Sequence, residues 1–483
     1  MSLLPLQLRL ATARFLLASL ALSACHSAPG GAPTPAPSTA SDVAEPTSCV
    51  APAPSSNSSL ADTPIADPLV TFDTAWAIIA RTHWDTTYNG VNWRALRDEL
   101  RPKAASAKTT GELRGILSDM VGRLKQSHFS IIPREVSDVA SGVGDKAADK
   151  SGTTGATFRL IEGDMVVTEV PPSSAAAKAG VRTGWRLESV RGCQLAPRLS
   201  RVTTGIESRR ASLMAYSVTT QLLAGPVGDT VIATFRDGDG RARTVPIVRD
   251  REAGTVAKFG NLPPMRSALS FERIQRDGKT VGIIRFNIWM PVLLPLFDAA
   301  MDSLRGSDAI IIDVRGNFGG VAGMASGVAG HFLDTATSIG TMIQRGVTMK
   351  FVANPRLTDT RNQRVAPFSG PVAVLVDELS ISTSELFAGG MKALGRARIV
   401  GSQSAGQALP SVPERLPNGD ILYHAIADFL APTGKSLEGD GVTPDERVMV
   451  TRRALLDGKD PAKDAALAWL VKAANMPRKA ATP

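Results

Sequence analysis

The fold class of this chain is decided by the stretch Val372-Ala-Val-Leu-Val-Asp-Glu-Leu-Ser-Ile-Ser382-Thr-Ser-Glu-Leu-Phe-Ala-Gly-Gly-Met-Lys-Ala-Leu394. Residues 372–376 are apolar and mostly β-branched, which predicts a buried strand, and the apolar residues after Ser384 recur on neighbouring turns of a helix. Ser382 therefore lies in a strand-to-helix turn, beside helix N-terminal N–H groups that favour negative charge. That position suits a nucleophile for acyl transfer, but a serine before a helix is also a common N-cap.

The residues around this stretch alternate in the same way. Residues 280–286 and 309–314 read as strands of a mostly parallel sheet. The second strand runs into Arg315-Gly-Asn-Phe-Gly-Gly320 and then a helix. These glycines either satisfy a turn that needs positive φ or present bare N–H groups to an oxyanion. Further on we expect strands at 398–400 and 421–430, a structured loop at 434–445 and a helix at 464–474.

The N-terminus has the pattern of an export signal. Two arginines precede an apolar run, residues 15–22, which is too short to span a membrane and ends in Leu22-Ser-Ala-Cys25. Residues 1–25 resemble a bacterial lipoprotein signal in which Cys25 is lipidated; an ordinary secretory signal is the alternative. Ser27 is not an acidic retention residue, so we expect an outer-membrane lipoprotein facing the periplasm, or a secreted protein. Residues 26–66 are rich in Pro, Ala, Ser and Thr and read as a disordered linker.

Composition limits the number of domains and the kinds of partner that the protein can have. With 483 residues and 43% hydrophobic content the chain can form two to four domains. The formal charge of +9 is spread along the chain, which argues against nucleic acid as a partner. The histidines and cysteines lack the spacing of a zinc site, so no metal is expected. If Cys25 is acylated, Cys49 and Cys193 can pair in an oxidising compartment or remain thiols.

Residues 67–135 read as a helical segment that carries a histidine. One helix begins near Pro68, and residues 113–124 have the three-and-four spacing of an amphipathic helix, capped by Thr109 or Thr110. The end of that helix leads to Ser127-His128. A histidine at a helix end commonly caps the last carbonyls, and it can also serve as a catalytic base.

Residues 150–250 resemble a PDZ domain, on the strength of Gly155-Ala-Thr-Phe158, the strand at 165–170 and the segment from Pro172 to Gly192. Such domains bind extended C-terminal peptides by strand addition. The resemblance implies that the peptide carboxylate is bound by backbone N–H groups of Gly155, Ala156, Thr157 and Phe158. The second glycine of the usual loop is absent here.

Three motifs in order, Arg315-Gly-Asn-Phe-Gly-Gly320, Ser380-Ile-Ser-Thr-Ser-Glu385 and Glu438-Gly-Asp-Gly-Val-Thr-Pro-Asp445, resemble the C-terminal processing, or tail-specific, serine peptidases and their tricorn-type relatives. The resemblance extends from about residue 68 to the end. It implies an α/β fold in which a ClpP/crotonase-like catalytic core, residues 265–483, carries the PDZ-like domain as an insert. It also implies activity on peptides or proteins without a cofactor.

The base distinguishes the branches of this family. The processing peptidases carry a lysine about 25 residues after the serine, where this chain has Gln407, which cannot accept a proton. The tricorn-like branch uses Ser, His and Glu, and its pattern matches Ser382, His128 and Glu438. The resemblance therefore implies that His128 is the base and that Glu438 orients it. The oxyanion would be bound by the N–H of Thr383 and that of Gly319 or Gly320.

Three functions remain open on the sequence. The first is a serine endopeptidase of the cell envelope, held at the membrane by its lipidated N-terminus and acting on peptides or unfolded proteins. The second is a non-catalytic protein that uses the same fold to bind peptides or hydrophobic ligands. The third is a Ser-Lys peptidase that recruits Lys435. The sequence does not indicate an oligomeric state.

Overall fold

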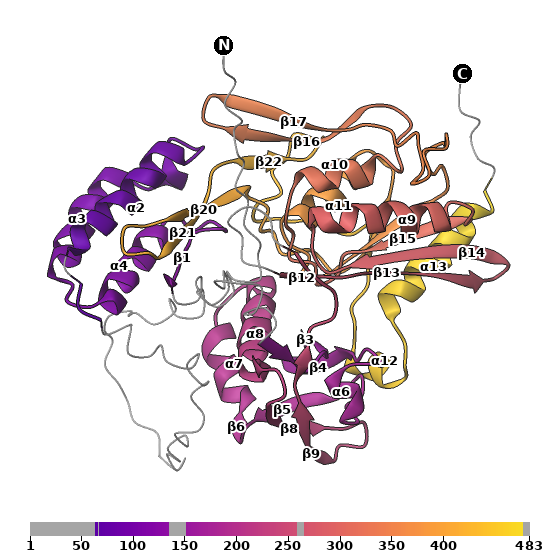
Figure 1. Ribbon diagram of the computed structural model, residues 1–483, viewed down its shortest axis with the longest axis horizontal. Coiled ribbons are helices and arrows are strands. Elements are labelled where there is room, and N and C mark those ends of the chain that lie inside the picture. Colours follow the sequence, from indigo (N-terminus) through magenta and orange to yellow (C-terminus); the bar gives the residue numbers. More distant parts are fainter. Residues whose placement is uncertain (1–62, 66, 135–150, 258–264, 477–483) are drawn as a thin grey trace, which may run out of the picture.

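The computed structural model describes residues 63–65, 67–134, 151–257 and 265–476 (Figure 1). The predicted signal, residues 1–25 with Cys25, and nearly all of the predicted linker, 26–66, lie outside the described residues. The described chain consists of an N-terminal group of helices, an α/β core, and a smaller unit, residues 151–251, which we call the insert.

Three helices form the N-terminal part: α2 (Pro68–Thr82), α3 (Trp93–Ser106) and α4 (Thr110–Gly122), with a short 3-10 turn, η2 (Tyr88–Gly90), after α2. Thr109 caps α4 in a capping box with Glu112, as its sequence predicts. Helix α3 was not predicted as a separate helix, because six of its 14 residues are charged and it contains Pro102. Its buried residues nevertheless follow helical spacing: Trp93, Leu96, Leu100 and Ala104.

A small sheet connects these helices to the core. Its strands are β1 (Ser130–Ile132), β21 (Ile421–Ala425) and β20 (Ser411–Arg415), in that order. The hairpin of β20 and β21 packs against α4, and Arg114 of α4 contacts Asp420 at 2.6 Å. The Asp420 side chain is completely buried and also accepts the backbone N–H of Arg134 at 2.9 Å. This carboxylate therefore fixes β1, the strand that directly follows His128, relative to α4.

We expect Asp420→Ala to lower the free energy of unfolding by about 3 kcal/mol. The substitution would take the Asp420 carboxylate away from the largely buried charge of Arg114. Urea or thermal unfolding would measure the loss. Asp119→Ala is the matched control: it breaks an exposed ion pair with Arg123 on the same helix and should cost less than about 1 kcal/mol. Equal losses in the two variants would contradict this role of Asp420.

The core is built on a six-stranded sheet. Its strands, in spatial order, are β13 (Leu269–Arg276), β14 (Lys279–Phe286), β15 (Ala309–Asp313), β18 (Val372–Val376), β19 (Arg398–Gly401) and β23 (Glu446–Arg447). β13 pairs antiparallel with β14, and all other neighbours are parallel. The predicted strands at 280–286, 309–314, 372–376 and 398–400 are thus confirmed as adjacent members of one sheet.

Helices cover both faces of this sheet, which explains why β18 is apolar throughout and β15 is apolar up to Asp313. Alternate residues of β15 show the division: Ile310 and Ile312 belong to the cluster formed with α9 (Leu294–Leu304), α10 (Gly323–Ala329) and α11 (Thr383–Ala393). Ala309 and Ile311 pack instead with α13 (Pro461–Ala474) on the opposite face. A 3-10 turn, η3 (Pro291–Leu293), precedes α9, and α12 (Arg452–Leu456) precedes α13.

One predicted strand is wrong. The segment 421–430 forms two strands in different sheets, β21 in the small sheet described above and β22 (Asp428–Leu430) beside β16 (Thr337–Gln344) and β17 (Val347–Ala353). Between them, the N–H of Ile426 donates to the carbonyl of Pro410. An apolar run predicts extended backbone, but the choice of sheet depends on partners far away in the sequence.

The insert has a sheet and a hydrophobic core of its own. Its antiparallel sheet consists of β3 (Thr157–Ile161), β4 (Asp164–Glu169), β5 (Arg186–Val190), β8 (Thr230–Arg236) and β9 (Ala242–Val248), with β6 (Cys193–Gln194) beside β5. Its helices are α6 (Ala175–Lys178), α7 (Leu195–Thr203) and α8 (Ser208–Leu223). Short strand pairs flank it: β2 (Ser151–Thr153) with β7 (Gly225–Pro226) and β10 (Asp250–Arg251), and β11 (Thr255–Ala257) with β12 (Met265–Ser267).

The insert is docked on the core through polar and apolar contacts. Arg159 of β3 forms an ion pair with Asp377, which directly follows β18, at 2.7 Å. Leu213 of α8 packs with residues of the core loops, Phe318, Leu379 and Ile381. Cys193 is buried and disulfide-bonded, and its partner lies outside the described residues.

Candidate active site

Ser382 occupies the turn between β18 and α11, as the sequence predicts. Its backbone has φ 55° and ψ −118°, a conformation that L-residues rarely adopt. The strain is tolerated because the flanking strand and helix are both buried. A sharp strand-to-helix turn of this kind projects a serine hydroxyl away from the backbone, as a nucleophile requires.

The glycine turn after β15 lies directly against Ser382. A Cβ atom on Gly319 would lie 2.6 Å from the Cβ of Ser382, and one on Gly320 would lie 2.3 Å from the carbonyl oxygen of Trp289. Both residues have positive φ, 88° and 143°. Close approach and backbone conformation therefore both require glycine at these two positions. The hydroxyl of Thr383 donates to the carbonyl of Gly320 at 2.9 Å and ties the turn to α11.

The three predicted oxyanion donors differ in their bonding. The N–H of Gly319 already donates to the side-chain oxygen of Asn317 at 3.0 Å. Among the described residues, the N–H groups of Gly320 and Thr383 make no hydrogen bond. These two donors are therefore the ones available to a substrate oxygen beside Ser382, and Gly319 serves the close packing instead.

A buried carboxylate that was not among the predicted site residues holds the Ser382 turn. Glu385 accepts the N–H of Ser382 at 3.1 Å and three further hydrogen bonds from the loop at 404–407: Ser404 Oγ at 2.6 Å, Gly406 N at 2.7 Å and Gln407 N at 3.0 Å. Burial raises the pKa of Glu385 to about 7. The spacing Ser382-x-x-Glu385 is that of a capping box, so the sequence did contain a signal for this contact.

Gln407 lies next to the turn that carries Ser382. Its carbonyl accepts the N–H of Ser382 at 2.9 Å. The residue at the position expected for a lysine is therefore adjacent to the serine in space, as the motif alignment implies.

His128 lies in the loop between α4 and β1, with φ 63° and only 4% of its surface exposed. Its ring packs near Tyr423 of β21, with centroids 5.8 Å apart, and its Nδ1 lies 2.7 Å from the hydroxyl of Ser127. Burial lowers the pKa of His128 to about 4, so the imidazole is neutral near pH 7. Within the described residues it makes no hydrogen bond to Ser382.

Glu438 reaches the histidine through Ser127. Its two carboxylate oxygens accept the Ser127 N–H at 2.7 Å and the Ser127 hydroxyl at 2.8 Å, across 311 residues of sequence. A third bond comes from the N–H of Ala408 at 3.0 Å. Burial is the largest influence on the pKa of Glu438 and raises it. The carboxylate of Glu438 is thus connected to the imidazole by a bridge through Ser127.

This bridge determines which ring nitrogen carries the proton. An ionised carboxylate only accepts hydrogen bonds, so the hydroxyl proton of Ser127 points to Glu438. The Ser127 oxygen can then only accept from His128, which places a proton on Nδ1 and leaves the lone pair on Nε2. That tautomer is the one that can accept a proton from a serine hydroxyl.

The predicted peptide-binding residues lie where the insert meets the core. Gly155, with φ 75°, packs against Ser174, and Phe158 points into the hydrophobic core of the insert. Thr157 bonds Thr168 on the neighbouring strand at 3.0 Å. β3 is an edge strand, so one side of its backbone is not paired within its sheet.

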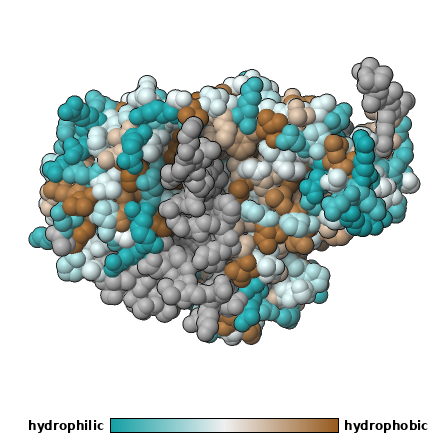
Figure 2. All heavy atoms as spheres, turned by 45° about the horizontal axis from the view of Figure 1, so that its top comes forward, coloured by the Kyte–Doolittle hydropathy of each residue, from teal (hydrophilic) through white to brown (hydrophobic). Residues whose placement is uncertain are grey.

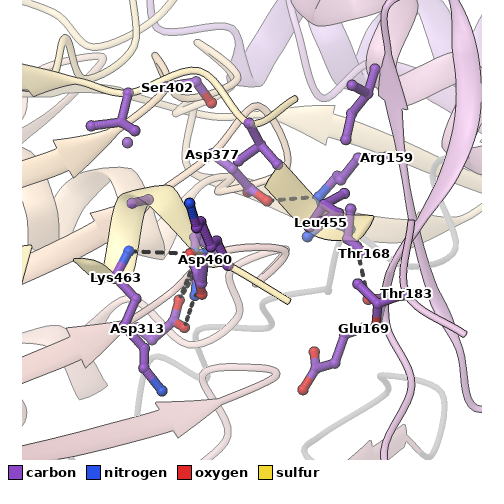
Figure 3. Close-up of a pocket in the computed structure, with 18 of the residues that line it drawn as sticks. Arg159, Thr168, Glu169, Thr183, Asp313, Asp377, Ser402, Leu455, Asp460 and Lys463 are labelled. Carbon is purple, nitrogen blue, oxygen red and sulfur yellow. Dashed lines mark hydrogen bonds and ion pairs between the residues drawn. The ribbon is translucent and has the colours of Figure 1, made fainter. Parts of the chain in front are cut away.

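A cavity of about 820 Å³ separates the β3–β4 edge of the insert from the carboxyl ends of the core strands (Figure 3). Arg159, Thr168 and Glu169 line it from the insert. Asp313, Asp377, Ser402, Asp460 and Lys463 line it from the core. Neither Ser382 nor His128 is among its lining residues. The cavity is therefore separate from the candidate catalytic residues Ser382 and His128.

The described residues contain neither a metal-binding group of side chains nor a helix that could span a membrane. No group of three His, Cys, Asp or Glu side chains there is placed to hold a metal ion. No helix in the same ranges is long and apolar enough to cross a bilayer. On the face drawn in Figure 2, hydrophobic side chains form several small groups among hydrophilic ones.

Comparison with known proteins agrees with this geometry. The model of peptidase family S41 matches residues 280–448, and the model of the tricorn protease C1 domain matches residues 64–122. The carboxyl-terminal-processing protease of Picosynechococcus sp. is 25% identical over 385 residues, covering 77% of this chain and 81% of its own. The chloroplastic carboxyl-terminal-processing peptidase 2 of Arabidopsis thaliana is 24% identical over 381 residues, covering 77% and 67%.

Solved structures share the fold at low identity. The photosystem II D1 C-terminal processing protease superposes with a TM-score of 0.56 at 18% identity, over 84% of this chain and 98% of its own. Mature CPAF superposes with a TM-score of 0.54 at 14% identity, over 83% and 95%. The mixed α/β architecture is thus that of known peptidases. Together with the sequence matches, it defines a serine peptidase. The chain belongs to peptidase family S41.

Proposed function

We propose that the protein is a serine endopeptidase of the bacterial cell envelope that hydrolyses peptides or unfolded proteins with Ser382, His128 and Glu438. The observation that carries this proposal is the hydrogen-bonded series from Glu438 through Ser127 to His128. This series joins the segment before the insert to a loop near the chain end. A merely structural histidine would not need a buried carboxylate to set its tautomer.

The reaction would be acyl transfer in two steps. His128 Nε2 takes the proton of Ser382 as the hydroxyl oxygen attacks the peptide carbonyl, and returns it to the leaving amine. In the second step His128 takes a proton from a water molecule as the water oxygen attacks the acyl-enzyme carbonyl. The Ser382 oxygen then leaves and receives that proton, which releases the acid product. The N–H groups of Thr383 and Gly320 stabilise the tetrahedral oxyanion, and loss of one such donor typically raises the barrier by about 3 kcal/mol.

Ser127 would transmit the effect of Glu438 to the base. We expect Ser127→Ala to lower kcat by about 10²- to 10⁴-fold, because the imidazolium loses its hydrogen-bonded support and the tautomer is no longer set. Steady-state hydrolysis of a peptide substrate measures the loss. Ser127→Thr keeps the hydroxyl and should retain most of the rate. If Ser127→Ala and Ser127→Thr lower kcat equally, the Ser127 hydroxyl does not connect Glu438 to His128.

The domain assignment extends the same proposal. The core, residues 265–483, would be of the ClpP/crotonase-like type, and the insert would be PDZ-like, with Gly155, Ala156, Thr157 and Phe158 next to the edge strand that receives a peptide. The position of β3 at the edge of its sheet supports this assignment. The disulfide at Cys193 supports an oxidising compartment such as the periplasm. Anchoring through lipidated Cys25 can be tested by mass spectrometry of the mature N-terminus.

A fluorophosphonate probe tests the proposed chemistry, because it reacts with activated serines only. We expect wild type and Lys435→Ala to be labelled, and Ser382→Ala and His128→Ala not to be. Labelling that survives His128→Ala but is lost in Lys435→Ala would replace the histidine by a lysine as base. An unlabelled and inactive wild type would favour the alternative, a peptide- or hydrophobic-ligand-binding protein on the same fold.

A further inference from the structure

Arg209 reaches from the insert into the core beside the candidate active site. It lies in the first turn of α8 and donates to three backbone carbonyls of the core: Ser404 at 3.2 Å, Gly439 at 2.9 Å and Asp440 at 2.8 Å. Glu207 at the start of the same helix fixes the guanidinium from the other side at 2.8 Å. The Arg209 side chain is only 18% exposed. Arg209 therefore ties the insert to two loops of the core, at residues 404–408 and 438–440.

The three carbonyls belong to the two loops that hold the catalytic groups in place. The loop at 404–408 supplies the Gly406 and Gln407 N–H groups to Glu385, which holds the Ser382 turn. The same loop supplies the N–H of Ala408 to Glu438. The two loops also bond to each other, since the N–H of Gly439 donates to the carbonyl of Gly406 at 2.9 Å. Arg209 thus closes a network that includes Glu438 and, through Glu385, the turn of Ser382.

The packing of α8 reinforces this connection. One and two turns after Arg209, Leu213 and Tyr216 lie against Phe318, and the rings of Tyr216 and Phe318 are 5.3 Å apart. Phe318 directly precedes Gly319, the glycine that packs on Ser382. One helix of the insert therefore contacts the glycine turn by apolar packing and the Glu438 loop by hydrogen bonds.

We propose that Arg209 is a positioning residue for the reaction of Ser382, so that the insert completes the active site as well as binding peptides. This inference rests on the proposed peptidase function. Arginine suits the role because its planar group offers five donors, enough for three carbonyls and one carboxylate at once, whereas lysine offers three. Without it the carbonyl of Gly439 would turn to water and that of Asp440 would keep only its bond from the Gln403 side chain, so the loop of Glu438 would shift relative to Ser127. A displacement of about 1 Å in a catalytic group can cost on the order of a hundredfold in rate.

The test compares Arg209→Ala, Arg209→Lys and Arg210→Ala in the whole protein. Arg210 is the matched control: it is the next residue of α8, is exposed, and bonds Glu207 through its backbone N–H, which the substitution keeps. We measure kcat and KM on a quenched peptide and the rate of fluorophosphonate labelling of Ser382. Circular dichroism and thermal unfolding report the folded fraction.

We expect Arg209→Ala to lower kcat and the labelling rate by about tenfold to a hundredfold, with KM within about twofold of wild type. Arg209→Lys should recover part of the loss, and Arg210→Ala should behave as wild type. The inference is overturned if Arg209→Ala matches Arg210→Ala, if KM rises while kcat is unchanged, or if the loss equals the loss of folded protein. Failure of the proposed function looks different, since wild type itself would then not be labelled.

Discussion

Ser382→Ala is expected to lower kcat by about 10⁶-fold, to a rate that only the oxyanion donors and substrate binding still support. The substitution removes the nucleophile and leaves the backbone turn in place, so peptide affinity should be preserved. Hydrolysis of a peptide substrate measures the rate, and binding of the same peptide to the variant measures the affinity.

A second serine provides the control for this result. Ser402 lies on the wall of the cavity between insert and core, which neither Ser382 nor His128 lines, and Ser402→Ala should keep its activity. Activity of Ser382→Ala above about one thousandth of wild type would show that another group attacks the substrate. Equal loss in both variants would indicate damage to the fold instead.

His128→Gln is expected to have a similarly large effect on kcat, about 10⁶-fold, because glutamine cannot accept the Ser382 proton. Since burial lowers the pKa of His128 to about 4, the wild-type base is neutral at any pH above that value. Activity should therefore persist into mildly acidic solution and fall as the pH drops towards 4. A pH profile of kcat/KM for wild type measures this limb, and an acid limb near pH 6.5 would contradict burial of the base.

The same histidine makes stability depend on pH. In the unfolded chain its pKa is about 6.5, so between pH 6.5 and 4 the unfolded state binds the proton and the folded state does not. Stability should fall by about 3 kcal/mol over this window as the pH decreases, and His128→Gln should not show this part of the loss.

Glu385 acts in the opposite direction. Its folded-state pKa is raised to about 7, so the stability that Glu385 contributes to the fold is present at low pH and is lost as the pH rises through 7. The difference between wild type and His128→Gln cancels this effect, because both proteins contain Glu385. Urea unfolding at pH 4.5 and 7 gives the comparison, and an unchanged difference between the two pH values would contradict the lowered pKa of His128.

Much of the core was predictable because its signals are local. The apolar residues of β18 and β15, the helix after Ser382 and the Thr109 cap each depend on residues within one turn or one strand. Ser382, His128 and Glu438 were selected by motifs, each of which is also local. The order of these motifs in the chain indicated the family, which the comparisons confirm.

Predictions failed where a choice depended on distant partners. The run 421–430 is extended as predicted, but its two halves pair with β1 and β20 on one side and with β16 on the other. Helix α8 and its contact with Phe318 were not anticipated, since nothing near Ser208–Leu223 in sequence indicates what that helix touches.

By itself, the sequence determined the strand-to-helix turn of Ser382, the alternating α/β core and the residue types needed for acyl transfer, because hydrophobic periodicity and turn chemistry act over a few residues. Only the tertiary structure decided how Glu438 reaches His128, which N–H groups remain for an oxyanion, and that Arg209 of the insert supports both catalytic loops. The Glu438 bridge and the Arg209 contacts depend on hydrogen bonds between segments 195 to 311 residues apart, whose geometry exists only once the sheet and its loops are packed.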